Sequence, residues 1–115
     1  MACNKLHIVN SVTVSETGGS VTLNFSRPIT LLEDKERFCF KIPCGVYISP
    51  NYENYLVLIS YNGTTLPLWN KYGNVAKVKE IRKGRVNTGF YGTENTAHII
   101  SNIPISVNCG CSSVL

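Results

Sequence analysis

Charged side chains are scarce in this sequence, and long apolar runs are absent. Only 16% of its 115 residues are charged, against about 25% in an average domain. No apolar run approaches the roughly 18 residues that a membrane-spanning helix needs, so we expect no membrane association. The start of the chain also lacks the apolar stretch of a signal peptide, because His7, Asn10 and Thr13 interrupt the nearest candidate. We therefore expect synthesis in the cytoplasm.

Five cysteines is an odd number, which excludes complete pairing within one chain. In the cytoplasm we expect reduced thiols, with Cys39 and Cys44 buried as small apolar residues. Two alternatives remain open. Four thiolates, from Cys39, Cys44, Cys109 and Cys111, match the ligand number of zinc, but their spacing differs from the paired Cys-x2-Cys of strong zinc motifs. The other alternative is a disulfide at Cys109 or Cys111. The leading expectation is that the protein binds no metal and no cofactor.

Groups for catalysis are few. The chain has two histidines, and His98 lies in a predicted strand, where a packed or interface role is expected. The carboxylates Glu33, Asp34 and Glu36 cluster in a segment typical of a solvated turn. There is no nucleophile elbow and no glycine-rich phosphate loop. The sequence therefore predicts a protein that is not an enzyme.

Apolar residues alternate with polar ones over several short segments, which is the pattern of half-buried β-strands. The run 55–59 is almost continuously apolar and predicts a central strand buried on both faces. Glycine-containing turns, above all Asn62-Gly63, favour hairpins. Short helices are predicted only at 31–37 and 76–83. Strands are expected at 6–14, 21–26, 37–42, 55–59, 65–69, 74–78, 85–91, 96–101 and, more weakly, 105–107.

These strands predict one all-β domain over residues 1–115. We expect an antiparallel sandwich or flattened barrel of roughly eight to ten short strands. The ends, 1–5 and 109–115, are expected to be loose or swapped onto a neighbour.

Basic residues gather in one part of the chain, with six of the eleven lysines and arginines inside fifteen residues. Such a cluster can meet phosphate or an acidic partner, or it can be a solvated hairpin that resists aggregation. Aromatic residues are not interleaved with it in a single-strand-binding pattern, so nucleic acid is not the expected partner. The cluster consists of Lys71, Lys77, Lys79, Arg82, Lys83 and Arg85.

Most aromatic residues lie between positions 47 and 91. Aromatic residues in strands usually fill a core, but they also form subunit interfaces or platforms on which sugars stack. Trp69 and Tyr72 flank a turn and are the best candidates for exposure. The full set of interface or ligand-stacking candidates is Trp69, Tyr72, Tyr47, Tyr52 and Tyr91.

The stretch 59–91 has a strand ending in Asn-Gly, a Leu-Pro-Leu strand, a Gly-Asn-Val turn, a turn ending in Lys-Gly and then Gly-Phe-Tyr. This order resembles a small β module of bacteriophage virion appendages, such as tail fibres, head fibres and related structural proteins. The resemblance implies a virion structural role and a trimer, and it carries no catalytic residue. The matching positions are Asn62, Gly63, Pro67, Leu68, Gly73, Val75, Ile81, Gly84 and Tyr91.

We therefore expect a bacteriophage structural protein located in the virion, as a fibre, capsid-decorating or tail-associated subunit. It would act by assembly, with strand edges and exposed aromatic residues docking on copies of itself and on other virion proteins rather than on a small-molecule substrate. One alternative is a carbohydrate- or receptor-binding module that stacks its ligand on Trp69 and Tyr72. A second is a nucleic-acid-binding β-barrel that uses the basic cluster.

Overall fold

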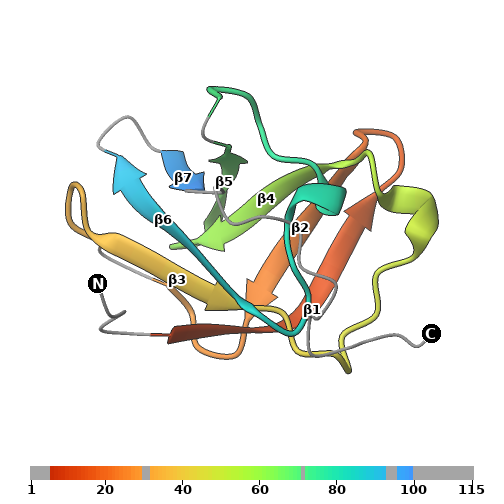
Figure 1. Cartoon of the computed structure of the whole chain (residues 1–115), viewed down its shortest axis with the longest axis horizontal. Coiled ribbons are helices and arrows are strands. Elements are labelled where there is room, and N and C mark those ends of the chain that lie inside the picture. Colours follow the sequence, from red (N-terminus) through yellow and green to blue (C-terminus); the bar gives the residue numbers. More distant parts are fainter. Residues whose placement is uncertain (1–5, 30–31, 71, 93–95, 100–115) are drawn as a thin grey trace.

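The strands of this chain pair in a closed ring, so the predicted all-β fold is confirmed (Figure 1). The computed structural model describes residues 6–29, 32–70, 72–92 and 96–99. The order around the barrel is β1-β2-β4-β5-β7-β6-β3. Two short 3-10 helices, η1 (Pro50–Tyr52) and η2 (Val78–Glu80), accompany the barrel. The strands are β1 (Leu6–Ser15), β2 (Ser20–Phe25), β3 (Arg37–Lys41), β4 (Leu56–Tyr61), β5 (Thr64–Trp69), β6 (Val86–Gly92) and β7 (Thr96–Ile99).

The barrel is mixed, whereas the sequence predicted an antiparallel sheet with more strands. Three of its pairs are parallel: β1 with β3, β2 with β4, and β5 with β7. These pairs join strands far apart in the sequence, as when Val21 lies opposite Val57, and local alternation holds no information on such partners. Every described strand has a neighbour on both sides. Docking through an open strand edge therefore finds no support in the described part of the chain.

A bulge in β1 changes which side chains face the core. The even spacing of Leu6, Ile8 and Val12 predicted that they share one face, but the register with β2 shifts between Val9 and Ser11. Val9 is buried in the core, while Leu6 is 45% exposed. One extra residue reverses the alternation of a strand, so the first half of β1 presents its odd-numbered residues to the core.

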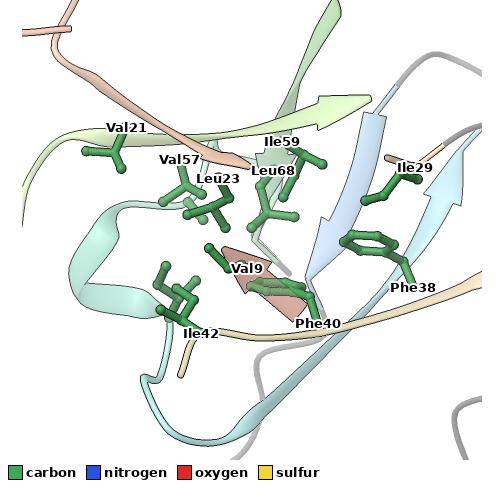
Figure 2. Packing of buried hydrophobic residues seen from close by; sticks show 12 residues of the cluster. Val9, Val21, Leu23, Ile29, Phe38, Phe40, Ile42, Val57, Ile59 and Leu68 are labelled. Atoms are coloured by element: carbon green, nitrogen blue, oxygen red, sulfur yellow. The ribbon is translucent and has the colours of Figure 1, made fainter. Parts of the chain in front are cut away.

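The core lies inside the barrel and is built from side chains of β1, β2, β3, β4 and β5 and of the segments that connect the strands. Figure 2 shows Val9, Leu68 and Phe40 among the side chains that converge at its centre. Phe38 and Phe40 are fully buried, and the ring of Phe25 meets both edge-on. Aromatic rings favour such edge contacts, so this end of the core is an aromatic cluster from β2 and β3.

The segment before η2 fills a gap between two diverging strands instead of forming the strand predicted at 74–78. The Ala76 N–H donates to the Leu68 carbonyl (2.6 Å), and the Ala76 carbonyl accepts from the Val57 N–H (2.9 Å). Ala76 is fully buried. Two isolated bridges, Leu56–Lys77 and Trp69–Val75, flank it. A small residue thus supplies hydrogen bonds to both β4 and β5 where they no longer pair directly.

The structure also differs from the sequence-based predictions for one strand and two helices. The apolar run 55–59 is not buried on both faces, because Leu56 is 38% exposed on β4. The predicted helix at 31–37 gives way to a turn in which the Glu36 N–H donates to the Glu33 carbonyl (2.9 Å). The predicted helix at 76–83 is reduced to η2. The predicted strand 105–107 and the chain ends 1–5 and 109–115 lie outside the described residues.

Candidate functional site

The five aromatic candidates divide into exposed and half-buried side chains. Tyr72 is 76% exposed and Tyr47 is 72% exposed, which confirms the expectation for Tyr72. Trp69 is half-buried on β5, and its indole nitrogen is shielded from solvent. The prediction of an exposed Trp69 is therefore wrong.

Tyr72 lies at the tip of a loop that one buried asparagine holds in shape. The Asn70 side-chain oxygen accepts from the N–H groups of Tyr72 (2.9 Å) and Asn74 (3.0 Å). The Asn70 N–H donates to the Asn74 carbonyl (2.7 Å), and Gly73 takes a φ of 85°. Glycine adopts this left-handed backbone without strain. The exposed ring is thus mounted on a loop that the barrel fixes.

The same asparagine ties this loop to η2. Its amide nitrogen donates to one oxygen of Glu80 (3.0 Å), and the other oxygen accepts from the Lys77 N–H (3.0 Å). Asn70 is only 8% exposed, and buried polar groups stabilise a fold when their hydrogen bonds are satisfied. These hydrogen bonds therefore hold together the described part of the connection from β5 to β6.

A second aromatic group gathers three tyrosines beside η1, and we call it the η1 cluster: Tyr47, Tyr52 and Tyr55. The ring centroids of Tyr52 and Tyr55 lie 4.9 Å apart. The Tyr52 hydroxyl donates to a carboxylate oxygen of Glu16 (2.9 Å), which comes from the turn between β1 and β2. Figure 1 shows that this turn, η1 and η2 lie at the same end of the barrel.

Glu16 also changes the acid–base properties of the η1 cluster. Its hydrogen bond with Tyr52 is the largest cause that raises the pKa of this phenol above 10.0, followed by the negative charge of Glu16. Smaller contributions come from burial and from the neighbouring phenols of Tyr55 and Tyr47. Because both effects of Glu16 favour the neutral phenol, Tyr52 remains a hydrogen-bond donor at neutral pH.

The fold divides the basic cluster. Lys77 and Lys79 are exposed, and their segment lies against the η1 cluster because the Lys79 N–H donates to the Glu53 carbonyl (2.9 Å) and the Val78 N–H to the Tyr55 carbonyl (2.9 Å). This proximity could not be predicted from the sequence, because the tyrosines and lysines are about 25 residues apart along the chain. Lys71 lies outside the described residues.

The remaining cations are half-buried around a second asparagine. Asn87, 8% exposed, accepts from the Arg82 N–H (3.1 Å) and donates to the carbonyls of Arg82 (3.1 Å) and Arg85 (3.2 Å). Lys83 is half-buried in the same turn, next to Gly84. The five described cations of the predicted patch are thus split into an exposed pair beside the tyrosines and a half-buried turn before β6.

Tyr91 belongs to a different arrangement. Its ring stacks on Tyr61, with centroids 5.4 Å apart, and the Tyr61 hydroxyl accepts from the Leu32 N–H (3.1 Å). A hydrogen bond to Tyr61 is the main cause that raises the pKa of Tyr91. The Tyr91 carbonyl accepts from the Lys35 N–H (2.7 Å). This pair of tyrosines fastens the segment after β2 to the barrel.

The cysteine expectations need correction. Cys39 and Cys44 are disulfide-bonded, so they are neither reduced thiols nor thiolate ligands for zinc. Cys39 is fully buried in β3. Cys109 and Cys111 lie outside the described residues. Within the described ranges, no group of three or more histidine, cysteine or acidic residues is placed to hold a metal ion.

His7 packs as part of the aromatic core. Its ring stacks on Phe38 at 5.1 Å and meets Phe25 edge-on at 6.1 Å. Next to it, a cavity of about 660 Å³ is lined by described residues from the start of β1 and from the segment that follows β2. These lining residues are Leu6, His7, Ile8, Ser26, Arg27 and Pro28, and none of them is a carboxylate or a thiol.

Comparisons with protein-family models, curated proteins and solved structures find no match to this chain. Among the described residues, no helix is long and apolar enough to span a membrane.

Proposed function

We propose that this chain is a structural subunit of a bacteriophage particle that works by assembly and not by catalysis. The observation that carries the proposal is the exposure of Tyr72, at 76%, on a loop held by Asn70. The resemblance of residues 59–91 to virion appendage modules supports the proposal that the particle is a bacteriophage. It also favours a trimer as the form in which the subunit assembles.

The Tyr72 loop has the properties of a docking element. A large aromatic side chain buries much apolar area at an interface while it loses little rotamer freedom. Ordering a flexible loop on binding costs free energy, and the hydrogen bonds of Asn70 reduce that cost because they already hold the backbone of Tyr72 and Asn74. A rigid tyrosine at a loop tip is thus well suited to fill a pocket on another subunit.

The closed ring decides where docking can occur. Because each described strand already has two neighbours, association through a new strand pair is disfavoured. Loops and outer faces remain as contact surfaces. A cyclic trimer needs two different surfaces on each subunit, and the Tyr72 loop would provide one of them.

Sedimentation velocity over a range of concentrations tests this proposal. The wild-type chain should sediment as a trimer at high concentration, and Tyr72→Ala should shift it towards the monomer. Tyr47→Ala is the matched control, because Tyr47 is almost as exposed but lies in the η1 cluster. A wild-type monomer at every concentration, or equal effects of the two variants, would contradict assembly through the Tyr72 loop.

A further inference from the structure

The η1 cluster combines the chemical groups that a neutral sugar requires. Tyr47 is 72% exposed and offers an aromatic ring to solvent, and it lies near enough to Tyr52 to contribute to the raised pKa of that phenol. A tyrosine supplies a flat apolar face and a polar hydroxyl in one rigid side chain. Glu16, which is exposed, holds the Tyr52 hydroxyl through one oxygen of its carboxylate. A carboxylate accepts at two oxygens and at several lone pairs, so it retains capacity for hydroxyl donors.

Short-range hydrogen bonds hold this cluster in one shape before any ligand arrives. The Ser49 hydroxyl accepts from the Asn51 N–H (3.2 Å), and Pro50 begins η1. The Tyr55 N–H donates to the Tyr52 carbonyl (2.9 Å). On the adjacent segment, the Leu56 N–H donates to the Gly19 carbonyl (2.9 Å), which links η1 to the turn that carries Glu16. A preorganised surface loses little entropy on binding.

The charge balance at this end of the barrel favours a neutral ligand over a polyanion. Lys77 and Lys79 contribute two positive charges, while Glu16, Glu53 and Glu80 contribute three negative ones. A polyanion gains affinity from uncompensated cations and displaced counterions, and here the carboxylates outnumber the cations. Ammonium and carboxylate groups around aromatic rings instead provide donors and acceptors for hydroxyl groups.

We propose that the η1 cluster, with Glu16, is a binding site for a neutral oligosaccharide, with one sugar ring stacked on Tyr47 and its hydroxyls bonded to the Glu16 carboxylate. This assigns sugar recognition to residues other than Trp69 and Tyr72. The site does not depend on the Tyr72 loop, so binding and assembly can fail separately.

Saturation-transfer NMR and titration with a panel of neutral oligosaccharides test the proposal. The panel contains oligomers of glucose, N-acetylglucosamine, mannose and galactose, and heparin oligosaccharides and single-stranded oligothymidine serve as polyanion probes. At least one neutral oligomer should bind saturably. Tyr47→Ala should weaken its binding by about fivefold to tenfold, the usual range for one aromatic stacking contact.

Three further variants make the test specific. Tyr47→Phe keeps the ring face and should bind within about twofold of wild type, since only the exposed hydroxyl is lost. Glu16→Gln should weaken binding, because a carboxylate is a stronger acceptor than an amide. Tyr72→Ala should leave binding unchanged. The proposal is wrong if no neutral oligomer binds, if only the polyanions bind, or if Tyr72→Ala weakens binding as much as Tyr47→Ala.

Discussion

Two pairs of tyrosines use their hydroxyl groups in different ways on this barrel. In the Tyr61–Tyr91 pair, one hydroxyl accepts from a backbone N–H of the segment after β2. In the Tyr52–Tyr55 pair, one hydroxyl donates to Glu16, an exposed carboxylate. The first pair joins two parts of the fold, whereas the second holds polar groups at the surface. The partner of the hydroxyl therefore separates tyrosines that stabilise the fold from tyrosines that can meet a ligand.

Truncation of Tyr61 should have the largest effect on stability. Tyr61→Ala removes the stack on Tyr91 and the partner of the Leu32 N–H. We expect the free energy of unfolding to fall by about 2–4 kcal/mol, measured by urea denaturation. Tyr47→Ala, at an exposed ring, should change it by about 0.5 kcal/mol or less. Similar losses for both variants would remove the distinction between the two pairs.

Local patterns in the sequence were sufficient for much of this fold. Period-two alternation located most strands within a few residues, and Asn62-Gly63 forms the expected hairpin turn, with both residues at positive φ. Alternation works because it reports which side of a strand is buried. It failed at β1, where the bulge between Val9 and Ser11 reverses the faces, because one inserted residue leaves no local signature.

The candidate site was harder to predict, because its parts come together only in three dimensions. Glu16, Tyr52 and Lys79 belong to three separate segments that backbone hydrogen bonds and the parallel β2–β4 pair bring to one end. The disulfide state of Cys39 and Cys44 was missed for the same reason: a bond between two sulfur atoms depends on distances that spacing does not give.

Removal of a single hydroxyl group from each pair should give a smaller difference in stability between the Tyr61–Tyr91 pair and the Tyr52–Tyr55 pair. Tyr61→Phe leaves the part-buried Leu32 N–H without its acceptor, so we expect a loss of about 1–2 kcal/mol. Tyr52→Phe breaks an exposed bond to Glu16 and should cost about 0.5 kcal/mol or less. Denaturant midpoints of the two variants, compared with wild type, provide the measurement. A larger loss of stability for Tyr52→Phe than for Tyr61→Phe would show that the main role of Glu16 is to stabilise the fold.

The smallest expected effect is a shift in alkaline titration. The folded-state pKa values of Tyr52 and Tyr91 lie above 10.0, so the fold favours their neutral forms. Their contribution to stability is fully present below the unfolded pKa and is lost as the pH rises through the folded values. Glu16→Gln should lower the pKa of Tyr52 towards its ordinary value and leave that of Tyr91 in place. Phenolate absorbance measures both, and equal shifts would contradict the separation of the two pairs.

Tyrosine acetylation followed by mass spectrometry tests the central claim most directly, that the exposed tyrosines are contact groups and the stacked pair is part of the fold. In dilute protein, Tyr47 and Tyr72 should react readily, while Tyr61 and Tyr91 should react slowly. In concentrated, assembled protein, Tyr72 should become protected and Tyr47 should remain reactive. Unchanged reactivity of Tyr72 on assembly would contradict the account.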